Sequence, residues 1–418
     1  MTPNKSPEEL YEERERRVRE AIQLKEPDRV PVVLGMAYFP ARYTGIQTAA
    51  AYYDAATWKE ANKKTILDFE PDLYRASSGQ NSGRAFEALD TKMYQWPGFN
   101  LPPTSGHQYV ESEYMKEDEY DLFLSDHADF LIRKYLPRVF GELEPLSRLP
   151  PLRTLHGVGL VNMVTQFIRP EFQKAAQAMY KAGQEAEKWR KIRGAFEEEM
   201  AALGFPPHGG GGGAGGAPFD EISDYFRGMR GAMIDMYRRP EKLLAACDML
   251  LQMRIKAAVP ADPKKRGNPK RLFLALHRGA EGFMSKKQFE TFYWPGLKKA
   301  VQASVDLGYA PMPFFEGKFG DRIEYLLEFP KGKVVCHFEQ TDMDRAKEVL
   351  GGHCCIMGNV PSSLLQTASA QEVDEYCAHL IKVCGKGGGF ILTNGSSIDD
   401  SKPENVKAFV DSVRKHHP

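Results

Sequence analysis

The chain has 418 residues, of which 42% are hydrophobic and 27% are charged. This is the composition of an ordinary globular protein, and it excludes collagen, coiled coil and disorder as the main architecture. The 56 basic and 56 acidic residues cancel, so no overall field attracts nucleic acid or an anionic membrane. The sequence has no apolar run long enough for a membrane span and no signal peptide pattern, so we expect a cytoplasmic protein.

The six cysteines also favour a reducing compartment. All of them lie in the second half of the chain, mostly inside apolar runs, and none forms a Cys-x-x-Cys pair. We therefore predict a reduced and mostly buried set. Cys354 and Cys355 are expected on a core strand, because adjacent strand residues face opposite sides and cannot easily share a tetrahedral metal ion.

The first part of the chain combines one clear helix with a long irregular region. An N-terminal helical extension is expected over residues 1–28, with its amphipathic part at 7–24. A short buried strand follows at 29–36, where β-branched residues stand between turn signals. Residues 90–150 are predicted to be an insertion or lid, because the loop at 90–115 is long, irregular and rich in proline, glycine and aromatic residues.

The second half alternates between short apolar strands and helices, after a long helix predicted over 170–203. This alternation predicts an α/β fold with a parallel sheet covered on both faces. At this length we expect a single domain over residues 1–418, with a (β/α)8 TIM barrel ahead of an open doubly wound sheet. The predicted strands are 272–277, 312–315, 333–338, 354–357 and 389–393, and the predicted helices are 286–306, 319–329, 342–350, 371–384 and one from 403.

A glycine-rich segment at 208–217 contains seven glycines and precedes a helix predicted over 221–239. Three interpretations stay open: a flexible lid, a simple connector, or a backbone cradle for a phosphate group. The segment lacks the Lys-Ser/Thr pair of a phosphate-binding loop, and its five consecutive glycines match no dinucleotide fingerprint.

Polar side chains follow the predicted strands, at the point where each strand ends. In parallel β/α folds these ends meet at one rim, where the active site lies. The candidate residues at this rim are Tyr38, Arg42, His277, Glu316, His337, Glu339, Asn359, Asn394 and Ser396.

Glu316 is the leading catalytic candidate. It follows two phenylalanines, so partial desolvation should raise the pKa of its carboxyl group, which suits a general acid or base or a metal ligand. The alternative is a simple ion pair with a neighbouring lysine or arginine. His337 and Glu339 are two positions apart and would share a side of an extended strand, as an acid–base pair or as metal ligands. For His337 and for His277, a purely hydrogen-bonded role is the alternative.

The remaining candidates are predicted to bind substrate. Arg42 lies in an aromatic loop and could clamp a carboxylate or phosphate, or form only a surface salt bridge. Tyr38 and Phe314 belong to a predicted aromatic wall that suits a small, partly apolar substrate.

Four stretches of the sequence carry a family resemblance. They are RVPVVLGMAYFPARY, APFDEISDYFRGMRGAMIDMYRRPEKLLAACD, AKEVLGGHCCIMGNVPSSLL and GGGFILTNGSSIDDSKPENVKAFVDSVRKH. The chain resembles the uroporphyrinogen decarboxylase superfamily, which also includes corrinoid-dependent methyltransferases such as the methylcobalamin:coenzyme M type. The resemblance is weak over residues 50–150 and strongest from about residue 310. It implies a (β/α)8 barrel with the site in its mouth.

Several positions depart from the family pattern. Uroporphyrinogen decarboxylases have two arginines after the first strand and a histidine in the last loop, where this chain has Tyr38, Arg42 and Ser396. The coenzyme M methyltransferases bind zinc through His-x-Cys and a later cysteine, where this chain has Phe314, Glu316 and Ser396. We therefore expect neither a zinc-thiolate centre nor a tightly bound cofactor; the identity of any other metal stays open.

The resemblance implies three candidate functions. The first is a corrinoid-dependent methyltransferase that takes a methyl group from a small O-, N- or S-methyl compound and passes it to cobalt on a separate corrinoid protein. Glu316 or His337 would then supply a proton to the leaving heteroatom. The alternatives are a decarboxylase of a tetrapyrrole or small carboxylic acid, and a non-catalytic corrinoid- or porphyrin-binding protein. Analogy with the decarboxylases also suggests a homodimer.

Overall fold

A ring of parallel strands forms the centre of the computed structural model, which describes residues 5–76, 81–210 and 212–418. Seven strands of these ranges form one parallel sheet in the order β2-β1-β9-β8-β7-β6-β5, and β3 and β4 form a separate antiparallel pair. The strands are β1 (Val32–Ala37), β2 (Leu73–Ala76), β3 (Tyr94–Gln95), β4 (Gln108–Tyr109), β5 (Arg271–Leu276), β6 (Ala310–Phe315), β7 (Val335–Phe338), β8 (Cys355–Val360) and β9 (Phe390–Asn394).

The segment 206–210 occupies the gap between β2 and β5. It forms parallel bridges with both neighbours, Pro207 with Tyr74 of β2 and Gly210 with Leu272 of β5. The His208 amide donates to the Tyr74 carbonyl at 2.8 Å. The segment stays irregular because two successive prolines at 206 and 207 have no N–H to donate to a strand ladder. It is the eighth strand position, and it brings the sheet round into a (β/α)8 barrel, as predicted.

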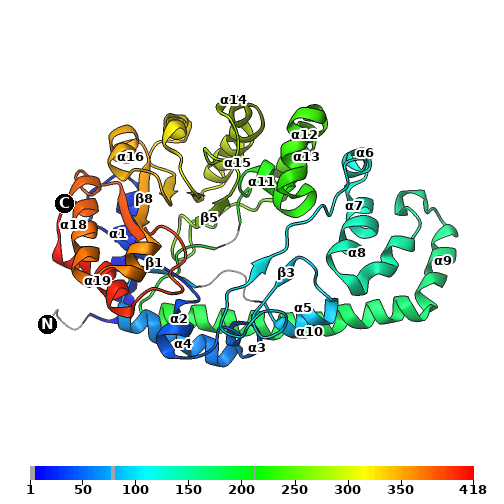
Figure 1. The fold of residues 1–418 in the computed structure, drawn as a ribbon, viewed down its shortest axis with the longest axis horizontal. Helices are drawn as coiled ribbons and strands as arrows, with labels where there is room; N and C mark the ends of the chain where they lie inside the picture. The colour runs from blue at the N-terminus through cyan, green and yellow to red at the C-terminus, as the bar shows by residue number, and fades with distance from the viewer. Residues whose placement is uncertain (1–4, 77–80, 211) are drawn as a thin grey trace.

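Helices surround the barrel. The long helix α10 leads away from it to a peripheral group of helices, α6 to α9 (Figure 1). The α-helices are α1 (Pro7–Ile22), α2 (Phe39–Thr44), α3 (Ala50–Tyr53), α4 (Ala55–Phe69), α5 (Gly83–Leu89), α6 (Tyr120–Ser125), α7 (His127–Phe130), α8 (Leu136–Val139), α9 (Gly159–Val164), α10 (Pro170–Ala202), α11 (Pro218–Glu221), α12 (Gly228–Arg238), α13 (Pro240–Ala257), α14 (Lys286–Gln288), α15 (Trp294–Asp306), α16 (Met343–Leu350), α17 (Ser362–Thr367), α18 (Ala370–Cys384) and α19 (Pro403–Lys415). The 3-10 and π-helical turns are η1 (Leu131–Tyr135), η2 (Gly141–Arg148), η3 (Leu152–Thr154), η4 (Thr165–Ile168), η5 (Ile222–Arg227), η6 (Phe289–Tyr293) and η7 (Gly320–Glu328).

Helix α1 closes the lower end of the barrel, where the strands begin. Its Val18 and Ile22 pack in one cluster with strand residues that face the barrel interior, among them Leu73 and Met312. Their burial stabilises this end by about 2 kcal/mol for each large side chain. A stable floor at this end leaves the opposite end, at the C-terminal ends of the strands, free for a site.

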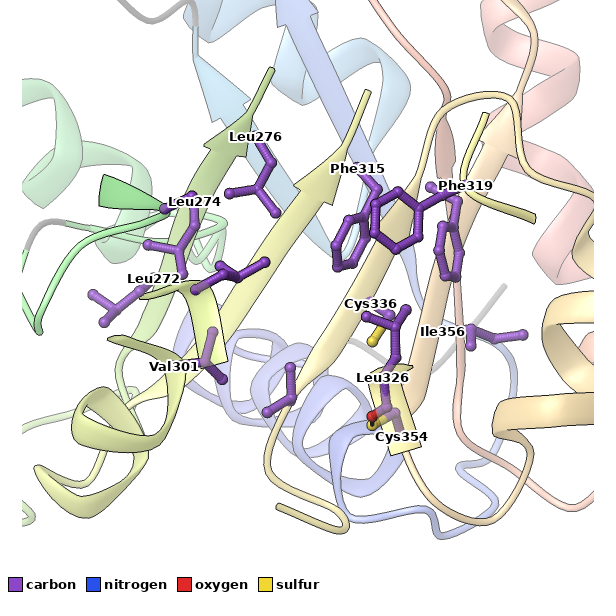
Figure 2. Close-up of a cluster of buried hydrophobic side chains, with 14 of the residues drawn as sticks. Leu272, Leu274, Leu276, Val301, Phe315, Phe319, Leu326, Cys336, Cys354 and Ile356 are labelled. Atoms are coloured by element: carbon purple, nitrogen blue, oxygen red, sulfur yellow. Dashed lines mark hydrogen bonds between the residues drawn. The ribbon is translucent and has the colours of Figure 1, made fainter. Parts of the chain in front are cut away.

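The outer face of the strands packs against the surrounding helices. Leu272, Leu274 and Leu276 of β5 point outward in one row, because alternate strand residues share a face. Figure 2 shows them beside Val301 of α15 in a cluster of buried side chains that continues across the neighbouring strands. Phe273, which lies between Leu272 and Leu274 in the strand, faces the barrel interior instead.

Most predicted elements are confirmed within one to three residues. The long helix at 170–203 is α10, and the N-terminal helix is α1. The segment predicted as one helix over 221–239 is instead α11, the π-turn η5 and α12, with a break at Gly228, whose φ is 68°. The helix predicted over 319–329 is the 3-10 helix η7. The helix predicted over 286–306 is α14, the π-turn η6 and α15, so the prediction of a continuous α-helix was wrong at all three places.

The cysteines and the hydropathy of the helices follow the expectations from the sequence. All six cysteines are buried free thiols. None of the helices in the described ranges has both the length and the apolar character that a membrane crossing requires.

Candidate active site

A cavity of about 320 Å³ opens at the C-terminal ends of the strands. Glu316 lines it directly after β6, with 42% of its side chain exposed. Side chains from six further strand positions or the loops after them complete the wall, among them Tyr38, Arg75, His208, Phe314, His337, Met357, Asn394 and Ser396. The rim predicted from the strand ends therefore exists, and most of the predicted residues meet there.

Glu316 lines the cavity, and His277 lies beside it, outside the residues that line the cavity. The imidazole Nε2 of His277 lies 3.8 Å from a carboxylate oxygen of Glu316, and its Nδ1 lies 2.5 Å from Asp224. The hydrogen bond to Asp224 raises the pKa of His277 to about 9, so the ring is a cation at neutral pH. Burial raises the pKa of Glu316, although the His277 charge partly offsets this effect. A protonated imidazole therefore lies next to Glu316, the carboxylate that lines the cavity, at physiological pH.

Asp220 holds the backbone that carries His277. This buried carboxylate of α11 accepts hydrogen bonds from the amides of His277 (3.1 Å) and Arg278 (2.9 Å) and from the Tyr293 hydroxyl (2.6 Å). Burial raises the pKa of Asp220 to about 6. Asp220 and Asp224 lie one turn apart after the glycine-rich segment, so this stretch of chain fixes the orientation of the histidine.

The inner layer of the cavity carries Arg75, His208 and His337. His337 is 4% exposed and its ring lies 4.4 Å from that of Phe314, with no hydrogen-bond partner for either ring nitrogen. The guanidinium of Arg75 stacks 3.6 Å above the ring of Phe273. Arg75 and His208 also border a wider depression of about 710 Å³ between α4 and α10.

Tyr38 forms part of the cavity wall, as predicted from its place after β1. Its hydroxyl is bonded to Tyr52 (2.7 Å) and to Nδ1 of His107 (2.9 Å), and its amide donates to Asp399 (2.6 Å). His107 and Gly106 line the cavity too. Residues of the predicted 90–115 loop thus contribute to the site.

Asn394 and Ser396 shape the loop after β9. The Asn394 side chain accepts from the Gly35 amide at 2.9 Å and donates to the Ser396 carbonyl at 2.7 Å. A Cβ at Gly35 would lie 3.0 Å from this amide nitrogen, so the glycine lets the two strands approach closely. Ser396 Oγ lies 2.9 Å from Ser362 Oγ. Both residues border the cavity, and Asn394 positions its wall.

Two predicted substrate-binding residues lie away from this cavity. Arg42 is half exposed and faces Asp400 at 3.5 Å, the surface ion pair that was its alternative interpretation. Asn359 borders a separate depression and donates to the Thr341 carbonyl at 2.8 Å. The expected pairing of His337 with Glu339 is also absent from this part of the described chain, because Glu339 accepts from the Gly317 amide at 2.6 Å and lies on that second depression.

Comparison with known proteins identifies the family. Residues 211–416 match the family model of uroporphyrinogen decarboxylase (URO-D). A segment of 76 residues, 18% of this chain, is 33% identical to the uroporphyrinogen decarboxylase of Pseudoalteromonas atlantica, and a segment of 141 residues, 33% of this chain, is 23% identical to that of Idiomarina loihiensis. Over residues 211–416, just under half of the chain, the sequence is therefore similar to the uroporphyrinogen decarboxylase family. The matched segments span 21% and 39% of the length of these two relatives.

The fold has a solved counterpart. A methyltransferase from Methanosarcina mazei matches with a TM-score of 0.58 and 14% identity, over 96% of this chain and 98% of that chain. At this identity the likeness concerns the fold, and it supports the barrel described above.

The three zinc-ligand positions of the coenzyme M type do not suit zinc in this uroporphyrinogen decarboxylase-like chain. Phe314 offers no donor atom and packs on His337. Ser396 offers a neutral hydroxyl that is already bonded to Ser362. Glu316 alone retains a ligand group, and no thiolate balances the charge of the ion. The residues therefore do not form a zinc-thiolate centre.

Sequence reasoning missed four residues of the candidate site: Arg75, His107, His208 and Asp224. Arg75 lies on a strand of only four residues with no apolar run, and His208 lies in the segment where glycine content dominated the interpretation. Asp224 lies 53 residues before its partner His277. The sequence held one signal for Arg75. It lies two residues after Leu73 on the same strand, so both side chains face the barrel interior.

Proposed function

We propose that this chain is the demethylating methyltransferase of a corrinoid-dependent system, acting on a small methylated compound. The observation that carries the proposal is the Glu316–His277–Asp224 group beside a cavity of about 320 Å³. This volume is near the lower end of the range for small-molecule sites, about 300–1,000 Å³. A tetrapyrrole with eight carboxylates needs more space and more cations than this cavity offers.

The acid–base group addresses the difficult part of demethylation. When a methyl group leaves oxygen, nitrogen or sulfur, the electron pair of the broken bond stays on the heteroatom. A protonated Glu316 can give its proton to the heteroatom as that charge develops, and the neighbouring His277 cation stabilises the Glu316 carboxylate that remains. The corrinoid of a separate partner protein is the second substrate, which accepts the methyl group. Tyr38 and Phe314 form a partly apolar wall against which the substrate packs.

The proposal is tested with cob(I)alamin as acceptor and a panel of methyl donors: 4-methoxybenzoate, trimethylamine and dimethyl sulfide. Wild-type protein should convert the cob(I)alamin spectrum to that of methylcobalamin with at least one donor. Glu316→Gln should abolish this conversion without changing the thermal midpoint, and Glu324→Gln, the same change at an exposed ion pair with Arg345, should retain it. Wild-type turnover by Glu316→Gln would remove this residue from the mechanism.

A second candidate is a decarboxylase of a small carboxylic acid, because Arg75 places a cation in the cavity. Release of CO2 from a porphyrinogen or a small acid, with no methylcobalamin formed, would favour it. Two other arginines that follow the strands do not reach this cavity: Arg278 is bonded to Asp224, and Arg322 is buried against the carbonyls of Gly279 and Met284.

A further inference from the structure

The inner layer of the cavity holds buried polar groups that the acid–base mechanism does not use. His337 and His208 are 4% and 2% exposed. Both ring nitrogens of His337 and Nε2 of His208 have no hydrogen-bond partner. Buried polar atoms are almost always paired, because an unpaired one costs about 1–3 kcal/mol. Two such side chains on one cavity indicate that a ligand supplies the missing partner.

Arg75 adds a cation to this pair. Among the described residues, its guanidinium forms no close ion pair, and Glu316 interacts with it only at longer range. The face of the guanidinium is occupied by the Phe273 ring, which leaves the edge N–H groups as donors. Burial lowers the pKa of Arg75 to about 10, and the group stays charged at neutral pH.

The two histidines are neutral donors in this layer. Burial, with a smaller contribution from Arg75, lowers the pKa of His337 to about 3, and burial also lowers the pKa of His208. A neutral imidazole carries one N–H donor and one acceptor. The layer therefore offers one positive charge and two further N–H groups, enough for the two oxygens of one carboxylate.

We infer that Arg75, His208 and His337 form a carboxylate-binding site at the base of the cavity, and that the substrate is a small methyl donor that carries a carboxylate. Its methyl-bearing heteroatom then faces Glu316 on the same cavity, and its apolar body lies along Phe314 and the other wall residues. A dianionic phosphate is disfavoured, because Arg75 neutralises only one charge and Glu316 lies close enough to interact with Arg75. The assignment to a methyl donor rests on the proposed function, whereas the carboxylate site is measurable by binding alone.

The test is calorimetric binding of 4-methoxybenzoate, its neutral isostere 4-methoxybenzamide, and inorganic phosphate to the full chain. The wild-type protein should bind the carboxylate at least about tenfold more tightly than the amide or phosphate, because hydrogen bonds to a charged group are the strong ones. Arg75→Gln and His337→Gln should each remove most of this preference. Arg193→Gln, which removes a charge from the neighbouring depression only, should retain it.

Three results would overturn the carboxylate site: equal affinity for the amide and the carboxylate, wild-type affinity in Arg75→Gln, or a loss in Arg193→Gln alone. If Arg75→Gln lowers the thermal midpoint, the comparison of the two ligands on wild-type protein and the His337→Gln variant still decide the question. Carboxylate-selective binding without methyl transfer would retain this site and refute the proposed function. Methyl transfer without carboxylate selectivity would do the opposite.

Discussion

Replacing Asp224 with asparagine removes the charge that holds His277 in its protonated form. The side chains are in contact at 2.5 Å, and asparagine keeps the shape and a hydrogen-bonding oxygen while it removes the negative charge. Because the bond to Asp224 is the largest cause of the raised pKa of His277, this pKa should fall toward its ordinary value in Asp224→Asn.

The size of the effect follows from the two pKa values. The pKa of His277 is raised from 6.5 to about 9, and one pKa unit corresponds to about 1.4 kcal/mol. The full difference is thus about 3.4 kcal/mol, but about a third of the imidazole is exposed and solvent screens the pair, which reduces the interaction to about 1–2 kcal/mol. We therefore expect the pKa of His277 to fall by about one unit in the variant.

The pH dependence of this stabilisation follows from the linkage between protonation of His277 and folding. The folded pKa of His277 lies above its unfolded value, so the stabilisation is fully present below pH 6.5 and is lost as the pH rises through about 9. Asp224→Asn should therefore lower the free energy of unfolding in urea at pH 6.5, and should change it little at pH 10. If His277 supplies protons, the alkaline limb of the methyl-transfer rate should also move to lower pH by about one unit.

Nuclear magnetic resonance titration of the His277 ring measures the pKa without substrate, with His277→Gln to assign the signal. Asp400→Asn is the control, since it removes a carboxylate that faces the half-exposed Arg42. A wild-type pKa at or below 6.5, or an unchanged pKa in Asp224→Asn, would refute the account of the acid–base group.

Two further predictions concern stability. Asp72 is fully buried and accepts from Arg17, Arg29 and the Val32 amide, so Asp72→Asn should lower the free energy of unfolding in urea by about 3–5 kcal/mol at pH 7. Burial alone would raise the pKa of Asp72, but the two arginines hold it below its ordinary value, so this contribution should fade as the pH drops below about 4; an equal loss at pH 7 and pH 3 would contradict it. Val18→Ala should cost about 2 kcal/mol, because α1 closes the barrel with this side chain, and a change below about 0.5 kcal/mol would show that α1 is only loosely attached.

The sequence by itself determined the local elements and the positions where side chains meet. Short apolar strands that alternate with helices predict parallel β/α units, because such strands are buried on both faces. The β6 strand therefore delivers Glu316 to the rim, and Tyr38, Phe314, His337, Asn394 and Ser396 reach the same cavity. These features depend on hydrophobic periodicity and on a rule of topology, which are both readable from the order of residues.

Only the tertiary structure decided which polar groups act together. The bond between His277 and Asp224 joins residues 53 positions apart, and the bridges of segment 206–210 depend on two strands that are remote in sequence. Neither Arg75 nor His208 lies in an apolar run, and only the two-residue spacing of Arg75 from buried Leu73 hinted at the base of the cavity. Arg42 faces outward because the short helix α2 begins directly after β1 and turns its side chain toward Asp400. Side-chain direction at a strand end is set by packing in three dimensions, and the linear pattern does not contain it.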